Sequence, residues 1–227
     1  MKRFITTLAL IITINVAWSQ LDIAAFGTDY TIDFTGFAGA GFDPDPTAEQ
    51  LDSDTWSVTG LSDGDLEFGD TGTSGDYAKG VTTGFVSSGG VYAADVFGNQ
   101  GLMVQPTGDD FTPGSFVLRL INTTGSTVGE LDVAYTIYAL NDQDRANSFN
   151  FSYSYDNESW IDVSDLDYVS PEFGVGLPEF EEKATTLVGL LWEDGQFFYI
   201  RWTGDDVSGS GSRDEFALDD IIINAAE

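Results

Sequence analysis

One stretch decides the fold class: Ser148-Phe149-Asn150-Phe151-Ser152-Tyr153-Ser154-Tyr155. Aromatic side chains alternate with small polar ones, so all four rings share one face of an extended strand. Residues 156–159 have turn-forming side chains, and Trp160 to Val163 begins a return strand. The stretch therefore predicts a β-hairpin with one aromatic face. That face is either core or a platform for sugar rings, and core is favoured because aromatic side chains contribute most to buried area.

The rest of the chain repeats this pattern of short strands and polar loops. Loops are expected at the Gly-, Asp- and Ser-rich clusters 69–75, 107–114 and 204–211, and Phe180–Ala184 is considered for a helical turn. The pattern indicates an all-β fold, a two-sheet antiparallel β-sandwich of jelly-roll type, and residues 20–227 suit one such domain. The other expected strands are Tyr30–Phe34, Thr55–Val58, Val91–Val96, Leu102–Gln105, Ser115–Ile121, Leu131–Leu140, Thr185–Val188, Phe197–Trp202 and Glu215–Ile223.

The N-terminal residues have the pattern of a secretory signal peptide. Lys2 and Arg3 give a short positive region, residues 4–16 are mostly apolar, and Ala17 and Ser19 are the small residues of a cleavage site. The apolar run is short for a membrane anchor and is interrupted by polar residues. We therefore expect residues 1–19 to be a signal peptide and the mature protein to be secreted, with no insertion into a membrane.

The remaining chain is strongly acidic. Lys2 and Arg3 are two of the eight basic residues, so residues 20–227 carry six basic and 38 acidic residues and a net charge of −32. Such a field repels nucleic acids and anionic membranes, so neither is an expected partner. The acidity is either adaptation of the surface to a salty medium or, at some positions, coordination of calcium.

Histidine and cysteine are absent from the sequence. Their absence excludes Ser-His-Asp and Cys-His nucleophiles, histidine general bases, ordinary zinc sites and disulfides. A carboxylate pair, as used in glycoside hydrolysis, is the catalytic arrangement that remains. The sequence singles out no such pair among its 38 acidic residues, so a binding protein is favoured over an enzyme.

The last expected strand carries two adjacent aspartates. On regular strand geometry Asp220 faces one side with the even-numbered apolar residues, and Asp219 faces the other side with the odd-numbered ones. Both sides are mainly apolar, so whichever is core receives a carboxylate, and a buried carboxylate requires a partner. That partner is either an arginine, such as Arg201 or Arg213, or a calcium ion, and the residues leave both open.

Several motifs resemble those of secreted jelly-roll domains. The ending Phe-Ala-Leu-Asp-Asp-Ile at 216–221 is similar to the last strand of MAM domains and of the cleaved adhesin domains of bacterial surface proteases and haemagglutinins. From Tyr30 to Ile223 the chain also resembles an uncharacterised domain of secreted proteins from marine and gliding bacteria. The other motifs that carry the resemblance are Thr31-Ile32-Asp33-Phe34, Asp54-Thr55-Trp56-Ser57-Val58, Asp63-Gly64-Asp65 and the hairpin at 151–160.

This resemblance implies a structural calcium ion that joins an acidic residue of the first strand to an aspartate of the last. On that pattern the ligands are Asp33 and Asp220, with Asp219 as the alternate, and Asp63 and Asp65 are further candidates. MAM domains also contain cysteines, which this chain lacks, so the bacterial domains are the nearer comparison. They imply a location outside a bacterial cell or on its surface.

Two other features are candidates for ligand contact. The loop at 141–147 gathers amides, acids and a guanidinium between two strong strands, as sugar-binding loops do, although a solvated turn is the favoured interpretation. Trp56 and Trp192 lie beside polar segments and are expected to be exposed. The candidate ligand-binding residues are Asn141, Asp142, Asp144, Arg145, Asn147 and Trp56.

Three functions follow, in order of preference. The first is a secreted, non-catalytic binding or adhesion module that holds a polysaccharide or cell-surface glycan and contains structural calcium. The second is a structural surface protein that makes only protein–protein contacts. The third is a carboxylate-based polysaccharide hydrolase.

Overall fold

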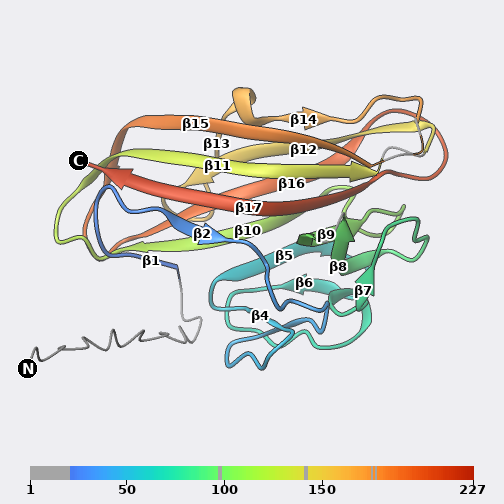
Figure 1. Ribbon diagram of the computed structural model, residues 1–227, viewed down its shortest axis with the longest axis horizontal. Coiled ribbons are helices and arrows are strands. Elements are labelled where there is room, and N and C mark those ends of the chain that lie inside the picture. The colour runs from blue at the N-terminus through green and yellow to red at the C-terminus, as the bar shows by residue number, and fades with distance from the viewer. Residues whose placement is uncertain (1–20, 97–98, 141–142, 175, 177) are drawn as a thin grey trace, which may run out of the picture.

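Two large β-sheets stacked face to face form the body of the protein (Figure 1). The computed structural model describes residues 21–96, 99–140, 143–174, 176 and 178–227. The expected signal peptide, residues 1–19, lies outside this part of the chain, so its assignment stays a prediction.

The first sheet, sheet A, contains eight strands. They are β1 (Leu21–Ile23), β5 (Trp56–Leu61), β6 (Gly64–Leu66), β10 (Gly114–Asn122), β12 (Arg145–Ser154), β13 (Ile161–Asp162), β14 (Tyr168–Val169) and β16 (Phe197–Gly209). Their order is β13-β12-β16-β10-β5-β6, with β14 paired to β12 and β1 paired to β10. The central strands β12, β16, β10 and β5 are antiparallel to one another.

The second sheet, sheet B, contains seven strands. They are β2 (Tyr30–Ile32), β7 (Val81–Thr82), β8 (Gly90–Val96), β9 (Asn99–Gln105), β11 (Val128–Leu140), β15 (Pro178–Trp192) and β17 (Glu215–Ala226). Their order is β15-β11-β17-β9-β8-β7, with β2 paired to β17. The remaining elements are the small sheet of β3 (Phe42–Asp43) and β4 (Leu51–Asp52) and the 3₁₀ turns η1 (Gly75–Tyr77) and η2 (Ser164–Leu166).

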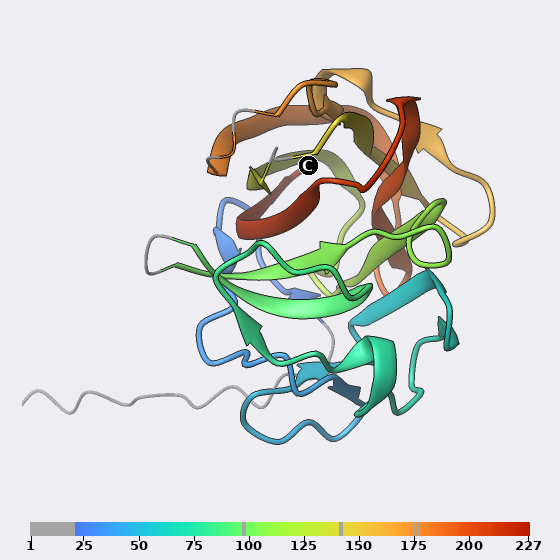
Figure 2. The same cartoon turned by 90° about the vertical axis from the view of Figure 1, so that its right-hand side faces the viewer.

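The predicted fold class, an all-β sandwich of jelly-roll type, is confirmed. Figure 2 shows the two layers from one end, with β11, β15 and β17 in the layer on the left and sheet A on the right. Three short pairs depart from the antiparallel expectation, since β1–β10, β3–β4 and β7–β8 are parallel. Alternation of side chains predicts a strand but not its direction, which explains why these pairs were not foreseen. Among the described residues, no helix is long and apolar enough to cross a membrane.

Aromatic side chains from both sheets meet in the core. Phe149 and Phe151 of β12 are fully buried, so the core interpretation of this face is confirmed for both. The ring of Phe151 lies 5.9 Å from Tyr135 of β11 and 5.8 Å from Trp202 of β16, measured between centroids. These contacts join the two sheets and fix which face of β16 is turned away from the core, a point on which the candidate site depends.

A β-bulge in β17 changes the alternation of that strand. Opposite Tyr135 of β11, β17 places two residues, Asp220 and Ile221, where a regular ladder has one. Asp220 has φ 49°, in the left-handed region, which aspartate tolerates better than most residues. Because the bulge adds one residue, Leu218 and Ile221 both point into the core while Asp220 is exposed. The predicted strict alternation along this strand is therefore wrong, and the Asp220 side chain does not point between the two sheets.

Candidate functional site

The outer face of sheet A carries the side chains that point away from the core. On β16, Phe198, Ile200 and Trp202 are buried between the sheets, so the residues between them face outward. Residues paired across antiparallel strands point to the same side, which extends this face over five strands. The outer face of sheet A comprises Ser57 and Thr59 of β5, Ser115, Val117, Arg119 and Ile121 of β10, Phe197, Tyr199, Arg201, Thr203 and Asp205 of β16, Ser148, Asn150, Ser152 and Ser154 of β12, and Asp162 of β13.

Arg201 lies near the centre of this face. Its guanidinium carbon is 3.9 Å from the centroid of the Trp160 ring, and its Nε donates a hydrogen bond of 3.0 Å to Ser152 Oγ. Burial lowers the pKa of Arg201, and the nearby charge of Asp162 opposes that change. No carboxylate of the described residues forms an ion pair with Arg201. An aromatic ring and a hydroxyl therefore hold this cation in place of an acid.

Arg119, on the neighbouring strand β10, is held in the same way. Its guanidinium carbon lies 4.4 Å from the ring centroid of Phe68 and 4.8 Å from that of Phe197. The closest carboxylate oxygen, on the partly exposed Asp54, is 3.8 Å from Nη2, and Nε has no hydrogen-bond partner among the described residues. Tyr199 lies against the same rings, and burial raises the pKa of its hydroxyl.

Hydroxyl and amide groups surround the two arginines. Thr59 Oγ1 and Ser115 Oγ share a hydrogen bond of 2.8 Å. Asn150 and Thr203 stand directly opposite each other on β12 and β16, and neither Asn150 Oδ1 nor Thr203 Oγ1 bonds to a described residue. Both atoms are buried, and polar groups so well covered are normally paired, so a ligand on this face would reach them only after local rearrangement. Flat cations, aromatic edges and hydroxyls together suit a polar ligand with an apolar face.

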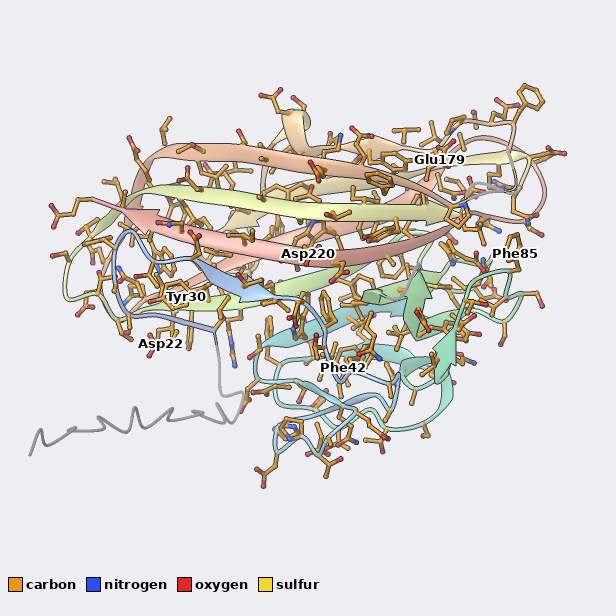
Figure 3. All side chains as sticks on the ribbon, in the orientation of Figure 1. Asp22, Tyr30, Phe42, Phe85, Glu179 and Asp220 are labelled. Carbon is orange, nitrogen blue, oxygen red and sulfur yellow. The ribbon has the colours of Figure 1, made fainter. Side chains whose placement is uncertain are left out.

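Three of the five residues predicted to bind calcium, Asp33, Asp219 and Asp220, lie close together elsewhere, on sheet B. Ile32 of β2 pairs with Ile221 of β17, so Asp33 and Asp220 follow directly beyond that pair. Figure 3 shows Asp220 partway along β17, beside the end of β2. The Asp33 carboxylate accepts a hydrogen bond of 3.0 Å from the Thr35 backbone.

Asp219 is the buried member of this trio, with 2% of its surface exposed. Burial raises its pKa to about 7, the negative charges of Asp220 and Asp33 add to the increase, and a hydrogen bond of 2.8 Å from the Asp220 backbone opposes it. Across the described ranges, no group of three or more acidic residues has the spacing of a metal site. Calcium at Asp33, Asp219 and Asp220 therefore stays a prediction.

Asp63 and Asp65 each bind backbone groups of their own region. Asp63 Oδ2 accepts a hydrogen bond of 2.9 Å from the Asp76 backbone, and Asp65 Oδ1 accepts one of 2.8 Å from Gly60. Asp76 in turn pairs with Lys79 at 2.9 Å. The structure does not bring Asp63 or Asp65 to Asp33, so the five predicted metal ligands do not form one site.

The predicted ligand loop at 141–147 is largely part of a closed polar network. Asn141 and Asp142 lie outside the described residues, and Asp144 is exposed. Arg145 Nη1 donates a hydrogen bond of 2.6 Å to Asp206 Oδ2, and Asn147 Nδ2 donates one of 3.0 Å to Asp206 Oδ1. Asn147 is 1% exposed, so a ligand would reach it only after local opening, and its predicted contact with a ligand stays a prediction.

The expected exposure of Trp56 and Trp192 is wrong, because 3% and 0% of their surfaces are exposed. Trp56 stacks on Trp202 with centroids 6.2 Å apart, and it also contacts Phe34 at 5.7 Å. Polar neighbours in sequence did not signal exposure because alternate residues of β5 face opposite sides of sheet A. Trp56 therefore supports the core beneath the candidate face and presents no ring to a ligand.

Sequence reasoning missed Arg119, Arg201 and Trp160 as a functional group. A signal was present, since an arginine in the middle of a strong apolar strand, as in Phe198 to Trp202, must point away from the core. The pairing of β10 with β16, which places the two arginines side by side, could not be read from the sequence.

No family model and no curated protein matches the sequence. Among solved structures, the K3 cleaved adhesin domain of Lys-gingipain from Porphyromonas gingivalis is similar, with a TM-score of 0.46 and 14% identity over 86% of this chain and 98% of that one. The C-terminal family 22 carbohydrate binding module of Clostridium thermocellum Xyn10B gives 0.41 and 12%, over 90% and 97%. The enzymatically active domain of bacteriophage CBA120 tailspike protein 4 gives 0.40 and 11%, over 77% of this chain and 20% of that one. Scores this low say nothing about function.

Proposed function

We propose that the protein is a secreted, non-catalytic carbohydrate-binding module that holds its glycan on the outer face of sheet A. One observation carries the proposal: Arg201 lies flat on Trp160, 3.9 Å from the ring centroid, amid hydroxyl and amide groups of three neighbouring strands. A sugar ring has an apolar face and a rim of hydroxyls. The outer face of sheet A offers aromatic surface to the first and hydrogen-bonding groups to the second.

The positions of the acidic groups support binding over hydrolysis. A glycosidase needs two carboxyl groups flanking the scissile bond, one of them with a raised pKa so that it can donate a proton. Asp52 and Asp219 are carboxyl groups whose pKa is raised, and they are 4% and 2% exposed. A substrate does not reach either group without local unfolding.

The test is glycan binding by two matched aromatic variants. Trp160→Ala removes the ring beneath Arg201, and we expect it to weaken binding by about tenfold, which corresponds to about 1.4 kcal/mol. Phe180→Ala is the control, because Phe180 is 66% exposed on β15 of the other sheet. A glycan array and a polysaccharide pull-down that both stay blank with the wild-type protein contradict the proposal. Equal loss of binding in the two variants contradicts the location of the site.

We also propose that calcium binds at Asp33, Asp219 and Asp220 as a structural ion. A buried carboxyl beside two other carboxylates requires either a proton or a cation, and oxygen-rich clusters suit Ca²⁺. Thermal unfolding with excess Ca²⁺ and with EDTA, at high constant ionic strength, tests this because salt suppresses general screening effects. We expect a higher midpoint with Ca²⁺ that is lost in Asp219→Ala. An unchanged midpoint means that Asp219 holds a proton.

A further inference from the structure

The basic residues of this acidic protein differ in whether a carboxylate lies close to them. Four of the six basic side chains in the described ranges have a carboxylate oxygen within 2.6–2.9 Å. These four are Lys79 with Asp76, Lys183 with Glu181, and Arg145 and Arg213 with Asp206. Each of these cations has a close carboxylate partner, and Arg145 and Arg213 share theirs.

The two exceptions, Arg119 and Arg201, are both on the outer face of sheet A. Arg119 is 3.8 Å from a carboxylate oxygen of the partly exposed Asp54, and Arg201 has no ion pair with any residue that the structure describes. With 38 acidic residues in the chain, acids are plentiful, and yet aromatic rings take their place at both arginines. The two arginines without a close carboxylate partner therefore lie on the same face, where Asp54 and Asp162 are the acids that act on them from farther away.

The strand register brings these two charges together. Arg201 pairs with Val117, and Arg119 pairs with Tyr199, so the arginines are diagonal neighbours on β10 and β16. Diagonal neighbours in an antiparallel pair are about 7–8 Å apart, a separation that one charged sugar unit spans. Arg201 uses Nε for Ser152, and its two terminal nitrogens make no hydrogen bond to a described residue. The edge that binds a carboxylate through two parallel hydrogen bonds is thus free.

We infer that the ligand of this face is an anionic glycan whose uronic acid carboxylates are bound by Arg201 and Arg119. The inference rests on the proposed function and adds the class of sugar to it. Charge complementarity is the argument, because the net charge of −32 over residues 20–227 repels anions everywhere except near uncompensated cations. A neutral glycan has no need of one arginine without an ion pair beside another whose carboxylate partner is 3.8 Å away. The planar guanidinium fits the planar carboxylate of a uronate.

The test compares polymers that share a backbone and differ in charge. Isothermal titration calorimetry measures binding of the purified protein to polygalacturonate, to alginate, to polygalacturonate with its carboxyl groups methyl-esterified, to dextran sulfate and to neutral glycans. Each titration is run in EDTA and repeated with Ca²⁺, since calcium bridges carboxylates of protein and polymer without any arginine. We expect a uronate polymer to bind at least about tenfold more tightly than the ester, as two charge-assisted hydrogen bonds provide.

Variants locate the effect. Arg201→Gln is expected to weaken uronate binding about tenfold more than it weakens binding of the methyl ester, and Arg119→Gln is expected to act in the same direction. Lys183→Gln is the control, because it removes the same charge from β15 of the other sheet. Thermal unfolding of each variant confirms that it is folded, and the two arginine variants serve as replacements for each other if one is not.

The outcomes separate the inference from the proposed function. Equal binding of acid and ester that Arg201→Gln does not change overturns the inference and leaves carbohydrate binding standing. Preference for dextran sulfate overturns the choice of a carboxylate. Uronate binding that disappears in EDTA shows calcium bridging and also overturns the inference. Failure to bind any polymer, charged or neutral, overturns both.

Discussion

Asp206 of β16 accepts hydrogen bonds from Nε and Nη2 of Arg213 at 2.8 and 2.7 Å, a two-pronged contact across the end of the sandwich. The same carboxylate accepts from Arg145 and Asn147 of β12. Asp206→Ala leaves three half-buried or buried donors without their acceptor. We expect a loss of about 1–3 kcal/mol in the free energy of unfolding, measured by denaturant titration. Glu181→Ala removes the exposed carboxylate that pairs with Lys183 and is expected to change stability by less than about 0.5 kcal/mol, so similar losses in both variants contradict this role.

Asp52 predicts a pH dependence of stability. Burial raises its pKa from 3.8 to about 6, and its Oδ2 has no hydrogen-bond partner among the described residues. The folded protein then binds a proton more tightly than the unfolded chain, so this group destabilises the fold progressively as the pH rises from about 4 to 6, and no further above that. As the pH rises over this range, the free energy of unfolding of Asp52→Asn should increase relative to that of wild type, by at most about 1.4 kcal/mol per pH unit.

Asp156 is expected to give a pH dependence of stability opposite to that of Asp52. Hydrogen bonds from the Ser159 and Glu158 backbones lower its pKa from 3.8 to about 2. Its contribution is present above pH 4 and is lost as the pH falls toward 2, so Asp156→Asn should lose stability relative to wild type as the pH rises through that range. Parallel curves for the two variants would show that neither carboxyl group is perturbed as described.

The bulge at Asp220 predicts an unusual order of substitutions. Its φ of 49° costs little for glycine and most for a β-branched residue. In EDTA, Asp220→Gly should be as stable as wild type or more so, and Asp220→Val should lose about 1–2 kcal/mol. Thermal unfolding checks both. If Asp220→Val is the more stable of the two, the left-handed conformation is absent in solution.

The buried hydrogen bond of Tyr135 allows a prediction of how much one such bond contributes to the free energy of unfolding. Its hydroxyl donates to the Leu166 carbonyl of η2 at 2.8 Å, and burial raises its pKa well above the usual range. Tyr135→Phe leaves that carbonyl unpaired, so we expect a loss of about 1–3 kcal/mol in the free energy of unfolding. Tyr153→Phe is the matched control, since its hydroxyl makes no hydrogen bond to a described residue, and it should change little.

Strands with a regular pattern of buried and polar residues could be predicted from the sequence. Phe149 and Phe151 show why, since their alternation is local and survives in the fold. The predictions for two segments were wrong for a common reason. Phe180–Ala184 has local helical character and 204–211 has loop composition, yet the first belongs to β15 and most of the second to β16. Pairing with β11 and β12 overrides local preference in both cases.

The candidate site was harder to predict than the fold. The sequence predicted ligand contacts in loops and a metal site at Asp33 and Asp220, and the structure does place these two aspartates close together. Arg119 and Arg201 are 82 positions apart and meet only because β10 pairs with β16. Trp160 belongs to the turn region after β12 and reaches Arg201 by folding back over the sheet. Such contacts depend on register, which a single sequence does not specify.

The bulge in β17 also bears on how the gene can vary. Removal of the Asp220 codon alone would restore a regular ladder opposite Tyr135, and Leu218, Ile221 and Ile223 would still face the core. A deletion of one residue in any regular part of the same strand inverts every side chain beyond it. The central strand of sheet B thus has one position at which its length can change by a codon without exchanging inside for outside.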